Sequence, residues 1–515
     1  MQPQDATLLH HHLDAVVART PRKVALVCQG HRYTYSDLDA QARALGQELS
    51  ARGVGRGERV ILFMDNSIEM VAAVYAVLRL GAVFVPVNPL TKREKLAYLL
   101  ADTRAVAMVA HGTLAGAWRE PVAHAVHLHT CVVVGEVTGA GEPRAMAWPQ
   151  ADTAPAQAPR CVETIDQDLA AIIYTSGSTG DPKGVMLTHL NMVSASRSVS
   201  GYLGMRADDV VICVLPLAFD YGLYQVLMAV RVGATVVLER SFAFPMRMLE
   251  TMARERVTVF PGVPTIFAVL MDLAALRDFD LSALRLISNT AAALPEDHIR
   301  GLRSLFPGAT LFSMYGLTEC KRVTYLPPSQ LDVRPTSVGR GMPNEEVWLV
   351  GDGGERLPNG SMGELVIRGS NVMRGYWEKP RETAEKLRPG PNPGEVLLYS
   401  GDIFRTDAEG WLYFVGRKDD IIKSRGEKVS PREVENAICA LEGVREAAVI
   451  GVADSVLGEA VKAFVVLKEG ARLAERDVIR HCLGRLENFM APKHVEFVHE
   501  LPRTDTGKVK KAALG

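Results

Sequence analysis

Residues 174–185 read YTSGSTGDPKGV and combine three glycines, four serine or threonine hydroxyls and one lysine. They overlap the end of a short apolar run, 169–174, which is typical of a buried strand. Gly177, Gly180 and Gly184 let backbone N–H groups approach an anion closely, because glycine adopts positive φ without steric cost. The hydroxyl donors are Thr175, Ser176, Ser178 and Thr179. Lys183 adds a positive charge, so the stretch predicts a phosphate-binding loop at a strand end.

Two other interpretations of this loop fit the residues less well. A Ser/Gly-rich stretch alone would favour a flexible turn, but the continuation Asp-Pro-Lys-Gly at 181–184 argues against it. No Gly-Lys-Ser/Thr tripeptide stands at the spacing of a Walker loop. An ordinary P-loop ATPase or kinase is therefore excluded.

Helical and strand patterns alternate along most of the chain. Helices are expected at 36–53 and 68–80, and strands at 59–64, 82–87, 210–215, 234–238, 257–260 and 284–287. This alternation predicts an α/β fold built from βαβ-type subdomains. Residues 363–414 predict a small β-rich subdomain, and residues 135–160, rich in Gly, Ala and Pro, predict an exposed connector.

The pattern changes after Asp419. Helices at 431–441 and 475–486 and strands at 446–452, 460–467 and 496–497 predict an α+β domain of ordinary size. A chain of 515 residues with 48% hydrophobic residues can bury more than one core. We therefore expect an N-terminal domain over 1–418 and a C-terminal cap over 419–515.

The amino-acid composition argues against several classes of function and location. A formal net charge of −1 gives no reason to expect nucleic acid as a partner. Seven scattered cysteines without a CxxC pair suit a reducing compartment such as the cytoplasm. The apolar stretch 70–87 is broken by Arg79 and Gly81, so it predicts a buried helix and strand rather than a membrane span, and no signal peptide is apparent. We expect His10, His11 and His12 to be solvated.

Four further motifs occur in a fixed order after the loop. They are MYGLTE at 314–319, YSGD at 399–402, GRKDDIIK at 416–423 and PRTDTGK at 502–508. Together with the loop they resemble the AMP-forming adenylating superfamily, which includes acyl- and aryl-CoA synthetases, amino-acid adenylation domains and firefly luciferase. The overall pattern is most similar to stand-alone acyl-CoA ligases.

The resemblance implies roles for the motif residues. Glu319 would bind Mg²⁺, Thr318 would contact the α-phosphate of ATP, and Lys183 would neutralise phosphate charge. Asp402 and Arg417 would hold the ribose. The remaining nucleotide contacts implied by the resemblance come from the loop 175–180 and from Thr290, Ala291, Ala292 and Tyr315. The family's purine wall is usually Gly-rich, whereas this chain has small residues other than glycine at 289–293.

The resemblance also implies that the C-terminal cap swings about Asp419. Lys508 would then reach the α-phosphate and the attacking carboxylate during adenylation. In the second orientation, a loop containing Lys423 and Gly426 would replace it and border the path of a pantetheine thiol. For the lysine at 423, a solvated surface charge is an equally good interpretation.

Substrate choice is expected to depend on Phe219, Asp220, Tyr221, Met314 and Gly316. Many acyl- and aryl-CoA synthetases have histidine where this chain has Phe219. Asp220 matches the aspartate with which amino-acid adenylation domains hold the substrate's amino group. It also precedes a predicted helix, so an N-cap role is an equal alternative.

Two functions follow from the resemblance. The first is ATP-dependent activation of a small carboxylic acid to an acyl-adenylate, followed by transfer to the thiol of CoA or phosphopantetheine. The second is a stand-alone amino-acid adenylating enzyme that loads a separate carrier protein. ATP and Mg²⁺ are the implied cofactors, and a homodimer is compatible with either function.

Overall fold

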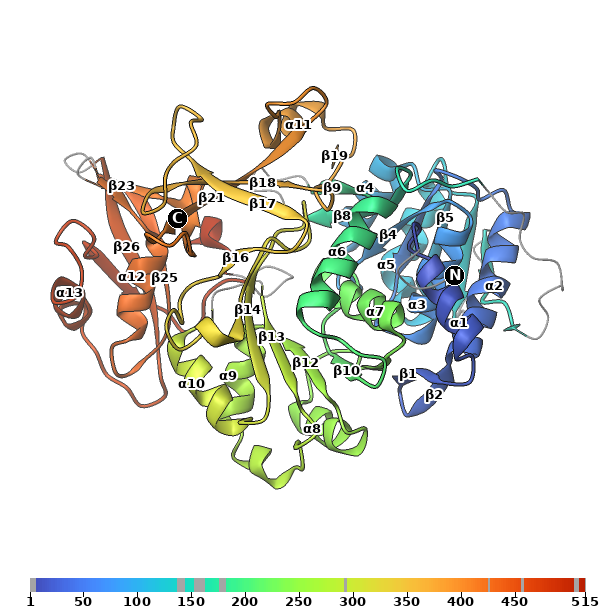
Figure 1. The fold of residues 1–515 in the computed structure, drawn as a ribbon, viewed down its shortest axis with the longest axis horizontal. Helices are drawn as coiled ribbons and strands as arrows, with labels where there is room; N and C mark the ends of the chain where they lie inside the picture. Colours follow the sequence, from blue (N-terminus) through green and yellow to red (C-terminus); the bar gives the residue numbers. More distant parts are fainter. Residues whose placement is uncertain are drawn as a thin grey trace. The chain divides into compact units, whose positions relative to one another are not determined.

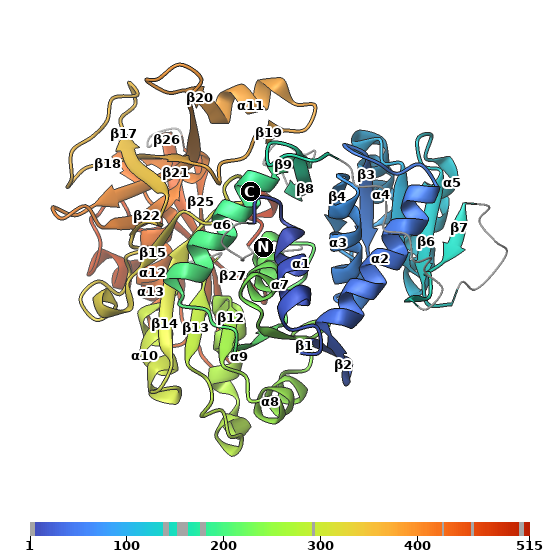
Figure 2. The ribbon, with the colours of Figure 1, turned by 45° about the vertical axis from the view of Figure 1, so that its right-hand side comes forward.

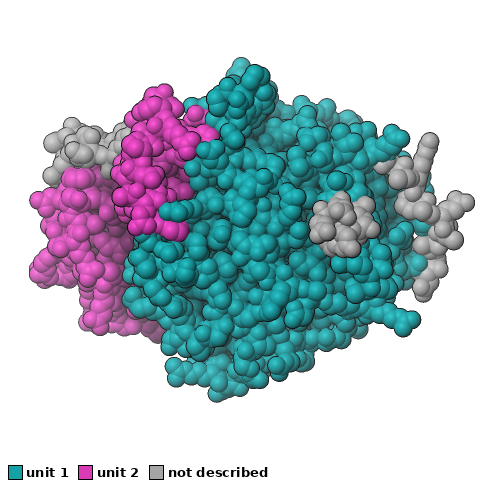
Figure 3. Space-filling model, in the orientation of Figure 1, with its two compact units in different colours: residues 1–347, 367–398 teal, residues 348–366, 399–515 magenta. Residues whose placement is uncertain are grey.

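The structure is a computed structural model that describes residues 6–136, 144–151, 163–175, 182–290, 294–424, 427–454, 458–503 and 509–514. The chain forms two compact units, coloured separately in Figure 3. Unit 1 comprises residues 1–347 and 367–398, and unit 2 comprises residues 348–366 and 399–515.

A nine-stranded sheet forms one half of unit 1. Its strands, in spatial order, are β16 (Arg340–Gly341), β15 (Thr324–Leu326), β14 (Thr310–Tyr315), β13 (Leu286–Asn289), β12 (Val259–Gly262), β10 (Val210–Cys213), β11 (Thr235–Leu238), β1 (Val24–Cys28) and β2 (His31–Thr34). The run from β14 to β1 is parallel. The carboxyl ends of these parallel strands therefore share one edge, where α/β folds place their ligands.

An eight-stranded sheet forms the other half of unit 1. Its order is β19 (Gly375–Tyr376), β9 (Lys183–Thr188), β8 (Leu169–Thr175), β4 (Val83–Val87), β3 (Arg59–Phe63), β5 (Ala107–His111), β6 (Thr130–Val134) and β7 (Ala145–Ala147). Strands β8 and β9 are antiparallel, so the chain reverses between residues 175 and 183.

Helices cover both sheets of unit 1 (Figure 1). The helices in the described part of unit 1 are α1 (His11–Arg19), α2 (Tyr35–Ala51), α3 (Ile68–Arg79), α4 (Arg93–Thr103), α5 (Ala115–His124), α6 (His189–Tyr202), α7 (Asp220–Val232), α8 (Pro245–Arg254), α9 (Pro264–Asp272), α10 (Glu296–Leu305) and α11 (Pro380–Lys386). Helix α6 packs against β8, β9 and α7, and α7 packs against β10 and β11, so these two helices lie between the sheets (Figure 2).

Helix α6 begins directly after β9, and its start follows from the local sequence. The Thr188 hydroxyl accepts a hydrogen bond from the Asn191 N–H, and the Asn191 side chain accepts one from the Thr188 N–H. This reciprocal capping satisfies two backbone donors that the first helical turn leaves without partners. The antiparallel strands β8 and β9 and the capped start of α6 therefore hold Thr175 and Lys183, the residues on either side of the predicted loop, in fixed positions.

A five-stranded sheet contains β17 (Glu345–Val350), β18 (Met362–Gly369), β21 (Val396–Thr406) and β20 (Leu387–Pro389), with β22 (Leu412–Arg417) beside β21. The chain after β22 belongs to unit 2 and forms an α+β body. Its strands are β23 (Ile422–Ser424), β24 (Glu427–Val429), β25 (Val444–Asp454), β26 (Gly458–Leu467) and β27 (His494–Phe497), and its helices are α12 (Pro431–Cys439) and α13 (Glu475–Leu483).

The α/β fold class is confirmed, and the predicted elements agree with the observed ones to within a few residues. Helix α3 and strand β4 occupy the apolar stretch 70–87 as predicted, and no helix in the described part of the chain is long and apolar enough to cross a membrane. The exposed connector at 135–160 was only partly right, because it contains β7, which pairs with β6. The boundary at residue 419 stays a prediction.

The expectation of solvated histidines at 10–12 was wrong. His12 is 1% exposed, because α1 packs against α2 and α7. His189 accepts a hydrogen bond from the Leu9 N–H at 3.1 Å, and its ring lies edge-on to that of His10. Burial lowers the pKa of His12 to about 3 and that of His189 to about 4, so both imidazoles are neutral at pH 7.

Candidate nucleotide and acid site

The β8–β9 hairpin frames the predicted phosphate loop. Thr175 pairs with Lys183 and Tyr174 pairs with Gly184, so the first threonine and the lysine of the motif face each other across the hairpin. A Cβ atom at Gly184 would lie 2.7 Å from Cγ2 of Ile172, which explains the glycine. Residues 176–180 lie outside the described part of the chain.

Tyr376 joins the phosphate hairpin to the second motif. It lies on β19 and pairs with Val185 of β9. The Lys183 ammonium lies 5.6 Å from the centroid of the Tyr376 ring, within the range of a cation–π contact. The Tyr376 hydroxyl donates a hydrogen bond of 2.6 Å to Oε1 of Glu319. Lys183 and Glu319 therefore contact the same buried tyrosine, which is 5% exposed.

A tight turn after β14 positions Glu319. A Cβ atom at Gly316 would lie 2.5 Å from the Lys321 carbonyl oxygen, so only glycine allows this close approach. Lys321 adopts a left-handed backbone conformation with φ of 67°. The Glu319 carbonyl accepts from the Met373 N–H at 2.7 Å, which ties the turn to the segment before β19. Tyr315, the last residue of β14, and Thr318, in the turn, are half-buried.

The donor set around Glu319 suits a hard cation held partly by phosphate. Oε1 accepts from Tyr376, and no hydrogen bond within the described residues occupies Oε2. Those residues contain no group of three or more His, Cys, Asp or Glu side chains that could hold a metal alone. Magnesium is usually bound by one or two carboxylates together with water and substrate phosphates, so a single carboxylate fits it.

Asp220 is the first residue of α7 and faces a buried lysine. The N-cap is Phe219, whose side chain makes no capping bond, so Asp220 is not the N-cap that the sequence left open. Its Oδ2 lies 3.5 Å from the Lys321 ammonium, which also donates to the Asp220 carbonyl at 2.9 Å. Burial lowers the pKa of Lys321 to about 7, although Asp220 opposes the shift.

Two other predicted pocket residues, Tyr221 and Met314, are buried. Tyr221 is buried and donates to the Ser288 carbonyl at 2.9 Å. Met314 is also buried, and its sulfur accepts a hydrogen bond of 2.9 Å from the Tyr202 hydroxyl. Thr290 is buried beyond the carboxyl end of β13, whereas Ala291 and Ala292 lie outside the described residues. Asp220, Thr290 and Tyr315 thus all stand at or beyond the carboxyl ends of parallel strands.

Unit 2 carries the predicted ribose residues. Asp402 on β21 pairs with Arg417 on β22, and the Arg417 Nε donates to Asp402 Oδ1 at 3.1 Å. Asp402 is 6% exposed. Glu364 accepts from the Gly401 N–H at 3.0 Å and from the Lys418 ammonium at 2.9 Å. It thereby contacts both sides of the hairpin next to the Asp402–Arg417 pair.

The predicted hinge follows this hairpin. Asp419 lies in a short 3₁₀ helix, Lys418–Asp420, between β22 and β23. Lys423 lies on β23, opposite residue 428 of β24. The side chains of Asp419 and Lys423 are not among those described, and Gly426 and Lys508 lie outside the described residues.

Comparisons with known proteins identify the family. Residues 13–377 match the family model described as AMP-binding enzyme, and residues 433–508 match its C-terminal domain. The chain belongs to the AMP-binding enzymes. It is 31% identical to a long-chain-fatty-acid–CoA ligase of Bacillus subtilis, over 96% of this chain and 92% of that protein. It is 32% identical to an L-proline–[L-prolyl-carrier protein] ligase of Pseudomonas fluorescens, over 98% of both chains.

Solved structures of AMP-binding enzymes share the fold. The crystal structure of the anthranilate CoA ligase AuaEII in complex with anthranoyl-AMP matches with a TM-score of 0.88 and 29% identity, covering 100% of this chain and 98% of that one. ATP-bound MatB from Rhodopseudomonas palustris matches with a TM-score of 0.86 and 30% identity, covering 98% of each chain.

Three contact residues of this AMP-binding enzyme escaped the sequence analysis: Tyr376, Lys321 and Glu364. Lys321 is the second residue after the MYGLTE motif, so its position was a usable signal. Tyr376 lies in the stretch Gly-Tyr-Trp at 375–377, which matches none of the motifs used to predict the site. Glu364 had no signal at all, because its role depends on a strand pairing.

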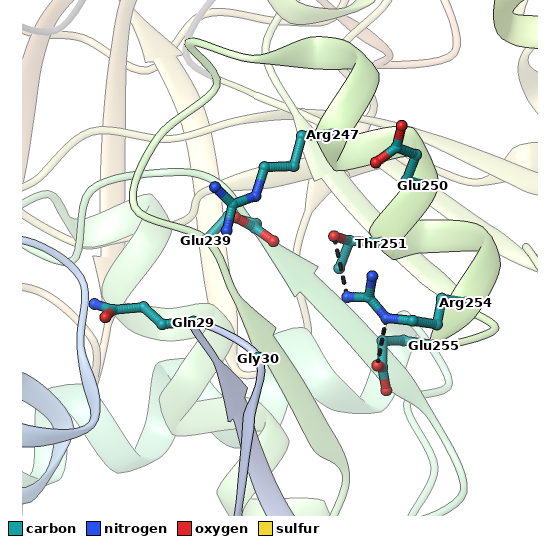
Figure 4. Close-up of a pocket in the computed structure, with 8 residues that line it drawn as sticks. All are labelled: Gln29, Gly30, Glu239, Arg247, Glu250, Thr251, Arg254 and Glu255. Atoms are coloured by element: carbon teal, nitrogen blue, oxygen red, sulfur yellow. Dashed lines mark hydrogen bonds and ion pairs between the residues drawn. The ribbon is translucent and has the colours of Figure 1, made fainter.

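A separate surface depression contains none of these residues. Its lining side chains come from the β1–β2 turn, the end of β11 and α8 (Figure 4). They are Gln29, Gly30, Glu239, Arg247, Glu250, Thr251, Arg254 and Glu255. Arg254 is bonded within the depression to Glu255 and Thr251. Since acids and bases are mixed there, the depression favours no ligand charge.

Proposed function

We propose that this AMP-binding enzyme uses ATP to convert a carboxylic acid into an acyl-adenylate, releases pyrophosphate, and then transfers the acyl group to the thiol of CoA or phosphopantetheine. The observation that carries the proposal is the contact of Lys183 and Glu319 with Tyr376. It brings a cation from the phosphate hairpin and a carboxylate from the MYGLTE turn to one buried side chain.

This arrangement suits attack of a carboxylate on the α-phosphate. The reaction crowds negative charge from two anions, so it depends on fixed positive groups and on alignment of the nucleophile. Lys183 supplies one positive charge, and Thr318 lies in the same turn as Glu319 to contact the phosphate. Magnesium held by Glu319 supplies further charge neutralisation when bound.

Asp402 and Arg417 support the nucleotide assignment for unit 2. A carboxylate that accepts from both ribose hydroxyls is a common way to hold a nucleoside. The Arg417 Nε bond orients Asp402, and Glu364 fixes the strand turn beside it. We assign Lys508 to the adenylation step, Lys423 and Gly426 to the thiol step, and the hinge to Asp419.

The acceptor thiol belongs either to CoA or to a separate carrier protein. Both classes occur among the relatives, as a fatty-acid–CoA ligase and an L-prolyl-carrier protein ligase. We place the reaction in the cytoplasm because the scattered cysteines suit a reducing compartment. A small carboxylic acid is the substrate in either case.

The test is ATP–pyrophosphate exchange in Glu319→Gln. Glutamine keeps the shape of the side chain and its bond to Tyr376 but removes the charge that would bind magnesium. We expect exchange to fall about 100-fold or more, as for the loss of one group that stabilises transition-state charge. The control is Glu385→Gln, an exposed carboxylate on α11. Equal exchange in both variants would contradict the proposal.

A further inference from the structure

Asp220, the residue that a substrate amine would contact, already has an internal counter-ion. The Lys321 ammonium lies 3.5 Å from its Oδ2 and donates to its backbone carbonyl at 2.9 Å. The Asp220 side chain is 23% exposed and the Lys321 side chain 2%. The lysine therefore lies on the protein side of the carboxylate, and an incoming group would reach Asp220 from the exposed side.

The position of Lys321 is fixed by its surroundings. Its ammonium lies 4.5 Å from the ring centroid of Tyr224 and 5.3 Å from that of Tyr221, so two aromatic faces surround it. The turn that carries it closes against Gly316, where any larger residue would meet the Lys321 carbonyl. Lys321 cannot swing away from Asp220 without breaking these contacts.

A second cation adds to the positive potential. Arg322 is 1% exposed, and its guanidinium carbon lies 5.1 Å from the Tyr221 ring centroid. Its Nε is buried and has no hydrogen-bond partner among the described residues. Lys321 and Arg322 thus place two basic side chains beside Tyr221 at the start of α7.

We propose that Lys321 is a specificity-determining residue, and that the acid pocket selects carboxylic acids without an ammonium group. This inference rests on the proposed adenylation function. A lone, partly buried carboxylate attracts an ammonium strongly through a charge-assisted hydrogen bond. When Lys321 is protonated, the carboxylate that it faces offers no net charge, and the nearby buried Arg322 adds positive potential, so an ammonium would lose its solvation shell for little return.

The experiment compares matched acids in ATP–pyrophosphate exchange. Each pair contains an amino acid and its counterpart without the amino group, such as L-phenylalanine with 3-phenylpropanoate and L-proline with cyclopentanecarboxylate. We expect wild-type kcat/KM to favour the amine-free member of every pair that reacts. Asp220→Asn should change both members of a pair by a similar factor, because neither acid depends on an ammonium contact with Asp220.

Lys321→Met provides the variant test, because methionine fills the space between the two tyrosine rings without a charge. It leaves Asp220 uncompensated, so we expect the ratio of amino acid to amine-free acid to rise about 10-fold or more. Adding Asp220→Asn should remove that gain. Lys92→Met, at an exposed lysine, is the control and should leave the ratio unchanged.

Several outcomes would overturn the inference. One is a wild-type preference for the amino acid in a pair, and this comparison needs no variant to fold. Another is an unchanged ratio in Lys321→Met when its circular dichroism spectrum matches the wild type. If none of the tested acids gives exchange with the wild-type enzyme, the proposed function itself fails and the inference falls with it. If only amino acids give exchange, the inference alone is refuted.

Discussion

Replacing Tyr376 with phenylalanine tests whether the contact between the two motifs matters for catalysis. The change removes the hydroxyl that donates to Glu319 at 2.6 Å but keeps the ring that faces Lys183 at 5.6 Å. A hydrogen bond to a charged group contributes about 1.5–3 kcal/mol. If that bond positions Glu319 for the transition state, kcat/KM for adenylation should fall about 10- to 150-fold.

The assay is the initial rate of pyrophosphate exchange as a function of magnesium concentration, together with urea unfolding. We expect a higher magnesium requirement and a lower kcat, because Glu319 is left with more rotational freedom. The control is Tyr413→Phe, which removes a hydroxyl that donates to Asp407 at 3.2 Å in unit 2. An exchange rate within about twofold of wild type in Tyr376→Phe would refute the reasoning.

Three other predictions concern stability and the cap. Gly222→Ala should destabilise the protein by about 1–3 kcal/mol in urea unfolding, since its Cβ would lie 2.4 Å from the Pro216 carbonyl oxygen, whereas Gly116→Ala in α5 meets nothing within 4 Å and should be tolerated. Because burial lowers the pKa of His189 to about 4, the unfolded state takes up its proton first as pH falls below about 6.5. The free energy of unfolding should therefore decrease as the pH falls from about 6.5 to about 4, and His189→Asn should make this decrease smaller. An equal decrease in the variant would contradict the lowered pKa of His189. Lys508→Ala should abolish most adenylate formation yet keep thioester formation from preformed adenylate, and equal loss of both half-reactions would contradict the swinging cap.

The sequence predicted the elements of this fold well where local patterns decide them. The boundaries of α3 and β4 follow from an apolar helix, a Gly81 turn and an apolar strand. The sequence could not predict that His12 is buried, because histidine is a polar residue and its burial here depends on the packing of α1 against α7. Strand β7 was missed because it has three residues in a Gly- and Pro-rich stretch.

The candidate site divides in the same way. Lys183, Glu319 and Asp402 stand in motifs whose resemblance to the family implies their chemistry. Tyr376 connects two of those motifs through the pairing of β19 with β9, which joins segments about 190 residues apart. The ion pair of Lys321 with Asp220 depends on a left-handed turn and on the start of α7, neither of which a linear pattern shows.

The central claim is that this enzyme forms an acyl-adenylate and passes the acyl group to a thiol. The most direct measurement is ATP–pyrophosphate exchange with a panel of fatty, aryl and amino acids. CoA or a phosphopantetheine carrier is then added, and the product is identified by mass spectrometry. The account predicts acid-dependent exchange and a thioester mass with one of the two thiols. Absence of exchange with every acid, or exchange with no thioester from either thiol, would contradict it.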